Sequence, residues 1–443
     1  MVSDLGKPEG RMRLAIIGTG IGGNAAAYAL SKSFKHDITV FEKEHRPGGH
    51  SATVDIDYDG HSISVDTGFI VYNEANYPNL TALFAHLGTP THGSDMSFAL
   101  SVDGGRFEWC GRANGPIGGL FAQPKNFFSP SYLKMLLEIV RFNRLAASDL
   151  AANRLDDNSL GQYLMANGFS SRFRNDYLLP MGAAIWSMST RSMLQFPAKA
   201  FISFFSNHHL LQYNGHQWRT VTGGSRVYVE KMVDAYRDRL HLSTPVSRVI
   251  RQDNGVVLTF ADGSTANFDG VIFGSHTDQT LAMLADATPQ ERSVLEAIAY
   301  KPNTVYLHRD PRLMPRRKKA WGSWNVIQDK DNSEELCVSY WMNRLQGIDK
   351  KYPLFVTLNP TEPPAEHLTF GRYTYDHPQF NSAAIAAQPV LSAIQGRHRA
   401  WFCGAWSRHG FHEDGLMSGL DVAERLGVIP GWRPMLNFAE AAE

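Results

Sequence analysis

Residues 14–23, Leu-Ala-Ile-Ile-Gly-Thr-Gly-Ile-Gly-Gly, decide the fold of this chain of 443 residues. The apolar run before the first glycine indicates a short buried strand, and the alanine-rich residues 24–30 indicate a tightly packed helix. A GxGxxG pattern between a strand and a helix is typical of a dinucleotide-binding turn, in which the helix N-terminus presents amides to the pyrophosphate. The residues expected at the pyrophosphate are Gly18, Gly20, Ile21, Gly22 and Gly23.

A second strand and an acidic residue complete this unit. Residues 38–41 predict the strand, and Glu42 stands at its end, about 20 residues beyond the glycines. A carboxylate at this place can accept hydrogen bonds from both hydroxyls of an adenosine ribose. Residues 14–42 therefore predict a βαβ unit that binds the ADP part of a dinucleotide.

The next residues narrow the dinucleotide to a flavin. Lys-Glu-His-Arg-Pro-Gly-Gly-His, residues 43–50, follow the ribose acid, and NAD enzymes usually lack such an extension. An acid followed by R-x-G-G resembles the flavin-containing amine oxidase and phytoene desaturase superfamily. The resemblance implies FAD, with the two glycines near the pyrophosphate and the histidine or serine after them facing the ribityl chain. The cofactor residues implied here are Lys43, Gly48, Gly49, His50 and Ser51.

The other end of the chain carries a second motif of this superfamily. Residues 402–404 predict a last strand, and residues 413–419, Glu-Asp-Gly-Leu-Met-Ser-Gly, open a helix. In the superfamily the strand delivers a glycine and an acid to the ribityl phosphate, and the helix N-terminus stabilises the reduced, anionic flavin. Ala405 stands where many relatives place Asp or Glu, so the ribityl contact must differ or be lost. The cofactor residues implied here are Gly404, Ala405, Gly415, Leu416 and Met417.

Three internal segments resemble the same template in the same order. Residues 66–70 resemble the segment that passes the isoalloxazine ring, the residue after 244–245 corresponds to one whose backbone meets adenine, and residues 270–276 resemble a returning strand beside the cofactor. The cofactor residues implied by these segments are Thr67, Gly68, Phe69, Ile70, Val246 and Ser275.

The predicted fold is α/β, with a Rossmann-like FAD-binding domain (parallel sheet plus β-meander) and an inserted mixed α+β substrate domain. We expect residues 1–80, 221–282 and 396–443 in the FAD-binding domain and residues 81–220 and 283–395 in the substrate domain. A region poor in strands is expected from about Leu80 to Val221, and residues 283–395 are expected to mix helix and strand. Residues 131–154 predict a long helix, with apolar side chains on one side at Leu133, Leu136, Leu137, Val140 and Leu145.

Composition excludes several classes of function. Lys and Arg number 43, Asp and Glu also 43, and no strongly basic stripe is present, so nucleic acid is not an expected partner. The three cysteines form no CxxC pair, and the histidines at 208–209 lack a third ligand at metal-binding spacing, so no metal is expected. Without a signal sequence or an apolar run of ~18 residues, a cytoplasmic protein is expected. The oligomeric state stays unknown.

Further residues direct the predicted chemistry towards lipids. Amine-oxidising relatives commonly carry a lysine that holds a water near the flavin, and Thr304 corresponds to it here, with Lys301 three residues away. The segments DTGFIVYNEANYPNL, CGAW and GFHEDGLMSGL resemble a bacterial subgroup of flavoproteins associated with cyclopropane-fatty-acid-synthase-like methyltransferases. This subgroup includes the methyl-fatty-acid desaturase of furan fatty acid formation and is similar to polyunsaturated fatty acid isomerases. The resemblance implies a long unsaturated, in some cases methylated, fatty acyl substrate.

The predicted reaction transfers a hydride from an allylic C–H bond to flavin N5, releases a proton to a base and forms a diene. Apolar side chains would bind the acyl chain, since burial contributes ~0.8 kcal/mol per methylene. Candidates for an apolar tunnel are residues 201–205, residues 181–188 with Trp186, and residues 341–342, although core packing is the commoner role of such residues. The candidate bases are His409, His412 and Glu413, followed by Tyr72 and Tyr340.

Three alternatives stay open: a fatty acid double-bond isomerase, an amine oxidase, and a non-catalytic flavin or lipid carrier, which the missing acid at Ala405 would allow. Contact with the inner face of a membrane also stays open. Residues 313–319, Leu-Met-Pro-Arg-Arg-Lys-Lys, combine two apolar residues with four cations and would suit anionic headgroups, although a solvated basic loop has the same composition.

Overall fold

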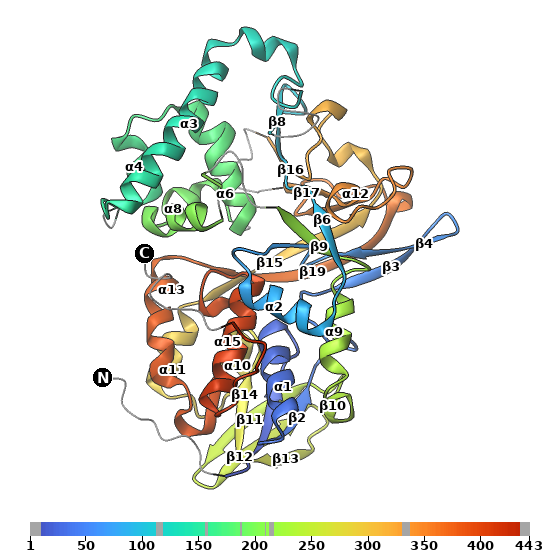
Figure 1. Cartoon of the computed structure of the whole chain (residues 1–443), viewed down its shortest axis with the longest axis vertical. Coiled ribbons are helices and arrows are strands. Elements are labelled where there is room, and N and C mark those ends of the chain that lie inside the picture. Colours follow the sequence, from blue (N-terminus) through green and yellow to red (C-terminus); the bar gives the residue numbers. More distant parts are fainter. Residues whose placement is uncertain are drawn as a thin grey trace.

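The computed structural model describes residues 10–111, 118–155, 158–186, 188–208, 210–211, 217–329 and 337–434. Figure 1 shows the parallel sheet and its helices at one end of the long axis and a group of helices at the other, with the long strands β15 (Ala299–His308) and β19 (Thr369–Gln379) crossing between them. The candidate site is built where these strands meet the parallel sheet.

The parallel sheet has five strands in the order β10-β2-β1-β14-β20. These are β1 (Arg13–Ile17), β2 (Asp37–Phe41), β10 (Leu240–His241), β14 (Gly270–Phe273) and β20 (Ala400–Phe402), and all four pairings are parallel. A meander of β11 (Val246–Gln252), β12 (Gly255–Phe260) and β13 (Thr265–Phe268) packs on one side. The predicted α/β class, with a parallel sheet and a meander, is confirmed.

The residues of β1 alternate between two cores, because successive side chains of a strand point to opposite faces. Leu14 and Ile16 pack with α1 (Ile21–Ser33), α9 (Arg226–Val233) and α15 (His412–Arg425). Ala15 and Ile17 pack with the meander, α11 (Pro289–Glu296) and α14 (Leu391–Ile394). The helix that carries the C-terminal motif therefore lies beside the helix that follows the first glycines.

The second large sheet is mixed and has seven strands in the order β19-β15-β18-β17-β16-β7-β8. Its other strands are β7 (Phe98–Val102), β8 (Phe107–Cys110), β16 (Trp324–Gln328), β17 (Cys337–Trp341) and β18 (Phe355–Leu358). The region after Leu80 that was expected to be poor in strands contains β7 and β8, because β7 pairs with β16, a partner more than two hundred residues later that no local pattern reveals. The proposed domain boundaries stay a prediction.

Smaller sheets and helices connect these parts. A hairpin joins β3 (Thr53–Tyr58) and β4 (His61–Asp66), and a three-stranded sheet joins β5 (Val71–Asn73), β9 (Trp218–Val221) and β6 (Thr91–Ser94). The remaining α-helices are α2 (Pro78–Leu87), α3 (Pro130–Ala151), α4 (Leu160–Ala166), α5 (Ser171–Phe173), α6 (Leu179–Trp186), α7 (Thr190–Leu194), α8 (Ala198–Asn207), α10 (Thr277–Met283), α12 (Met342–Leu345) and α13 (Ser382–Ala387).

Candidate functional site

The first glycine turn combines tight packing with one open position. A methyl group on Gly23 would lie 2.0 Å from the carbonyl oxygen of Gly18, and one on Gly22 would lie 3.1 Å from the amide nitrogen of Gly404. One on Gly20 would meet no atom closer than 3.9 Å. The turn therefore packs against the chain at its ends and leaves space over its middle glycine, as a bound pyrophosphate requires.

The N-terminus of α1 faces this space. Gly20 is its N-cap residue and Ile21 its first residue, and no side chain caps the helix. The first amides of a helix lack partners within the helix, and together with the helix dipole they favour an anion. Such an uncapped start is the usual binding place for a phosphate group.

Glu42 is held at the end of β2 beside the turn. Its carboxylate accepts hydrogen bonds from the amide (2.8 Å) and the hydroxyl (2.6 Å) of Thr19 and from the amide of Glu44 (3.0 Å). Carboxylate oxygens offer about four acceptor positions, so a fourth remains for a ribose hydroxyl. Thr19 stands at a variable (x) position of the GxGxxG pattern, so its role was not predicted from the sequence.

A second glycine loop lies against the first. Gly48 and Gly49 have φ of +105° and +55°, and a methyl group on Gly49 would lie 3.1 Å from the Cα of Gly20. The guanidinium of Arg46 closes the loop by donating to the carbonyl oxygen of Gly49 (3.0 Å). The carbonyl of His50 accepts from the amide of Phe69 (2.8 Å), which attaches the 67–70 segment to this loop.

The C-terminal motif completes the cradle. The amide of Gly404 donates to the hydroxyl of Ser418 (2.8 Å), and a methyl group on Gly415 would lie 3.4 Å from the amide nitrogen of Ala405. The strand end and the start of α15 are thus joined directly next to Gly22. The N-terminal glycine turn and the C-terminal motif meet here.

The other predicted cofactor residues lie around these loops at different depths. The amide of Ser275 lies near Gly18, and Thr67 and Leu416 are buried. Lys43 is exposed and pairs with Glu44 at 3.9 Å, so its side chain points to solvent. Half-buried positions are taken by Gly68, Ile70, Val246 and Met417. Their contacts with a cofactor stay predictions.

His412 and Phe69 pack face to face at the start of α15. Their ring centroids are 3.8 Å apart, and the planes differ by 9°. The Nε2 of His412 lies 2.6 Å from the hydroxyl of Tyr228, which lies 2.5 Å from the Oγ of Ser51. Burial lowers the pKa of His412 to about 3, so its imidazole is neutral. Tyr228, which lies on α9, was not found from the sequence.

Glu413, the second candidate base, is engaged by another helix. Its carboxylate accepts from the amides of Asn79 (2.9 Å) and Leu80 (3.0 Å) and from the side chain of Asn79 (2.7 Å). Burial raises its pKa to about 7, against the opposite effect of these three donors. Glu413 therefore caps α2, which begins at Pro78, and it ties α2 to α15.

His409, the third candidate, is exposed, and its amide donates to Asp414 (3.2 Å), which also accepts from the amide of Phe411 (2.9 Å). Asp414 therefore fixes the loop that leads into α15. The catalytic assignments of His409, His412 and Glu413 stay predictions.

A cluster of imidazoles and phenols lies beside His50. The ring of His50 is 5.1 Å from that of Tyr375, 5.6 Å from that of His377 and 6.0 Å from that of His276, between centroids. Tyr375 also contacts Thr67, 2.7 Å between hydroxyl oxygens. Burial, with His377 and His276 nearby, lowers the pKa of His50 well below its usual value, and burial beside His276 lowers that of His377 to about 4. The cluster therefore stays neutral at neutral pH.

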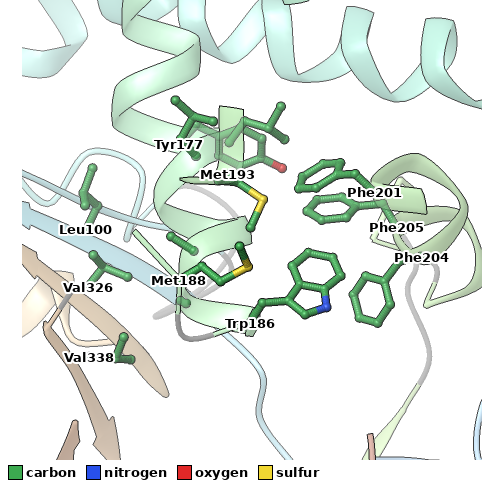
Figure 2. Packing of buried hydrophobic residues seen from close by; sticks show 14 of the residues in the cluster. Leu100, Tyr177, Trp186, Met188, Met193, Phe201, Phe204, Phe205, Val326 and Val338 are labelled. Carbon is green, nitrogen blue, oxygen red and sulfur yellow. The ribbon is translucent and has the colours of Figure 1, made fainter. Parts of the chain in front are cut away.

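An aromatic run connects α15 with a buried cluster between α6 and α8. Phe411, directly before α15, stacks on Phe204 with centroids 4.8 Å apart, and Phe204 lies 4.7 Å from Trp186. Figure 2 shows Trp186 grouped with Phe201, Phe204 and Phe205. These residues, predicted to line a tunnel, are packed as core side chains, and their role as a substrate wall stays a prediction. Met188 and Met342 are likewise buried.

No group of metal-binding side chains is found in the part of the chain that the structure describes. His208 stacks on Phe204 at 3.9 Å, whereas His209 lies outside the described residues. Among the described helices, none has the length and hydropathy needed to cross a membrane.

Comparison with known proteins assigns the class. Residues 21–344 match the flavin-containing amine oxidoreductase family, and the chain belongs to this family. Comparison with curated proteins finds no match. Solved structures with the same fold include a fatty acid isomerase from P. acnes that produces CLA, at TM-score 0.66 and 16% identity over 94% of this chain and 98% of that one. Putrescine oxidase bound to putrescine (TM-score 0.64, 16%, 94% and 98%) and cyclohexylamine oxidase from Brevibacterium oxydans IH-35A (0.63, 16%, 94% and 99%) are also similar.

The protein is thus an FAD-dependent oxidoreductase of the amine oxidase family. The residues present fit this cofactor: the open space over Gly20, the uncapped start of α1 and the fixed carboxylate of Glu42 meet the needs of its ADP part. The chain supplies no acid at Ala405, so the resemblance to the superfamily is incomplete at the ribityl position.

Proposed function

We propose that the protein oxidises a long unsaturated fatty acyl chain, removing two hydrogens to give a diene. The single observation that supports this most is the aromatic run, because it brings buried apolar side chains from α8 directly to the start of α15. Such side chains would bind an acyl chain in proportion to the methylenes that it buries among them. The P. acnes protein with the same fold is a fatty acid isomerase, which shows that this fold can serve fatty acids.

Charge near the site argues against an amine. A protonated amine would need an anionic partner, but Glu413 and Asp414 are both engaged by backbone amides. The imidazoles of His50 and His377 supply no anion either, because burial lowers their pKa values and keeps them neutral at neutral pH. By resemblance, Thr304 stands at the position of the lysine of amine-oxidising relatives. Its backbone amide donates to the Oδ1 of Asn359 (2.9 Å).

In the proposed reaction one C–H bond releases a hydride with its electron pair, and the neighbouring carbon releases a proton as the new double bond forms. FAD, when bound, accepts the hydride. The proton goes to water or to a base, for which His409, His412 and Glu413 remain the candidates. The neutral imidazoles beside His50 place no charge in the site. The apolar run would position the acyl chain, and positioning decides which of its similarly reactive C–H bonds is broken.

The isomerase is the second candidate, and the fold shared with the P. acnes protein favours it. In that reaction the abstracted hydride returns to another carbon of the same chain, so no net oxidation occurs. An anaerobic experiment separates the two. Substrate should bleach the visible flavin absorbance permanently in a desaturase and only transiently in an isomerase.

The direct test uses the FAD-loaded protein with extracted bacterial lipids, including methylated ones, and follows acyl masses. Loss of two hydrogens is expected, and unchanged masses with moved double bonds would replace the proposal by the isomerase. A parallel panel of polyamines and aromatic amines is read by hydrogen peroxide release. Peroxide from an amine would establish an amine oxidase, and a protein that no lipid or amine reduces would be a flavin or lipid carrier.

A further inference from the structure

Helix α3 has apolar side chains on two opposite faces. Tyr132, Met135 and Phe142 are fully buried against the rest of the helical part. Leu133, Leu137 and Val140, at the helical spacing i, i+4, i+7, are instead 39, 72 and 49% exposed. One face packs in the core, and the other is a solvent-exposed apolar stripe.

The stripe continues beyond the helix. Phe127 and Phe128, on the single 3₁₀ turn before α3 (Pro124–Phe128), are 59 and 83% exposed, with ring centroids 5.6 Å apart. We call the five exposed apolar residues the α3 face: Phe127, Phe128, Leu133, Leu137 and Val140. Large exposed side chains gathered in this way mark an interaction surface rather than scattered surface residues. In Figure 1, α3 lies at the end of the molecule away from the parallel sheet.

In this segment the exposed and the buried charged side chains differ in sign. The exposed ones are all cationic: Lys125, Lys134, Arg141 and Arg144. The only acids of residues 124–151 are buried and engaged. Glu138 accepts from the amide (3.1 Å) and hydroxyl of Ser170, and Asp149 accepts from the hydroxyl of Tyr163 (2.8 Å). An apolar stripe whose own segment exposes only cationic charge is complementary to a surface that is apolar inside and anionic outside.

We propose that the α3 face docks the protein on a membrane that contains anionic lipids. The apolar side chains enter the boundary between headgroups and acyl chains, and the four cations contact the headgroups. A second copy of the chain is the poorer partner, because a twofold contact would place like charges of the two copies together. The inference goes beyond the proposed reaction and does not depend on it, although it would bring the site to a source of acyl chains.

The basic loop at 313–319, from which membrane contact was first expected, lacks an apolar surface. Met314 is buried beside Trp321, and Leu313 is half-buried. Arg312, Arg316 and Lys318 line a surface cavity of about 400 Å³ together with Met314 and Trp321. The loop thus supplies cations without side chains for insertion, and it provides a matched control for charge.

Vesicle sedimentation tests the proposal with the FAD-loaded protein. Wild type should bind mixed phosphatidylcholine–phosphatidylglycerol vesicles and bind phosphatidylcholine vesicles much more weakly. Each inserted large apolar side chain strengthens binding about tenfold or more, so Phe128→Ser with Leu137→Ser should weaken it about a hundredfold. Each cation near an anionic surface contributes about fivefold, so Lys134→Gln with Arg144→Gln should weaken binding roughly 25-fold.

Two controls keep the test specific. Ile429→Ser removes an equally exposed apolar residue elsewhere, and Arg316→Gln with Lys318→Gln removes two cations from the basic loop; both should leave vesicle binding within about twofold of wild type. The proposal is overturned if the wild type does not bind anionic vesicles, or if neither α3 variant binds these vesicles more weakly than the controls do. It is also overturned if wild type forms a dimer that the Phe128→Ser, Leu137→Ser variant dissolves, since the α3 face would then join two copies.

Discussion

Replacing His412 by glutamine should make the protein's stability less sensitive to acid. Burial lowers the pKa of His412 from the ordinary 6.5 to about 3. Between these two values the unfolded chain binds a proton at this residue and the folded protein does not. The free energy of unfolding therefore falls as the pH is lowered from 6.5 towards 3, and the contribution is fully present above 6.5.

The size of the effect follows from the distance between the working pH and the ordinary pKa of histidine. At pH 5 the solution is about 1.5 units below the ordinary pKa, and each unit corresponds to about 1.4 kcal/mol, so the loss is about 2 kcal/mol. Unfolding entropy of about 2 cal/mol/K per residue, over 443 residues, converts this to a decrease in Tm of about 2 °C. Glutamine can still hydrogen-bond to Tyr228 but does not titrate. The Tm difference between pH 7 and pH 5 should thus be about 2 °C smaller in the variant.

Thermal unfolding of the FAD-loaded protein, followed by circular dichroism and flavin fluorescence at both pH values, measures this difference. At pH 7 the variant should be less stable by about 1 kcal/mol, because it loses the stacking on Phe69. His409→Gln is the matched control, since this histidine is exposed and three residues away, and it should keep the wild-type pH dependence. If His412→Gln shows the same acid sensitivity as wild type, the folded protein does not hold His412 neutral, and the reasoning fails.

Three further predictions concern the cradle and its surroundings. Gly22→Ala should lower the flavin content after gel filtration, because the new methyl group would press on backbone atoms at 3.1–3.2 Å, whereas Gly431→Ala, with nothing within 4 Å, should not. Tyr228→Phe should lower stability by about 1–3 kcal/mol in denaturant titration, since two buried partners lose its hydroxyl; an unchanged midpoint would contradict this. Phe204→Leu should cost about 1 kcal/mol and weaken acyl binding more than Phe173→Leu, and equal weakening would argue against the aromatic run as a substrate wall.

The cofactor end was predictable because its requirements are local. The glycine turn, the helix behind it and the acid at Glu42 all lie within one short βαβ unit. Each of them has a role that its residue type and position in the unit explain. The C-terminal motif was recognisable for the same reason, and its helix begins at His412, one residue before the predicted start at Glu413.

The residues that complete the site depend on long-range pairing. Tyr375 and His377 reach His50 from β19, which pairs with β15 along its whole length. The only signal in the sequence is the alternation of Tyr373, Tyr375 and His377, which places them on one face of a strand but does not say what that face meets. The role of Glu413 was also hidden, because the helix that it caps lies more than three hundred residues before it.

Helix α3 illustrates a different limit. Its period of apolar residues predicts a helix correctly, yet the predicted side includes Leu133, Leu137 and Val140, which face solvent. Periodicity reports that a face is apolar and not what covers it. Only burial in the folded chain distinguishes a core face from an interaction surface.

The packing of α15 on α1 has a consequence for synthesis. A methyl group on Gly419 would lie 2.1 Å from the carbonyl oxygen of Gly22, so the two backbones touch without side chains between them. While the chain emerges from the ribosome, the alanine face of α1 stays uncovered until α15 is translated, several hundred residues later. Flavin loading should then follow the synthesis of α15, and a nascent chain released before α15 should carry no flavin at all rather than bind it weakly.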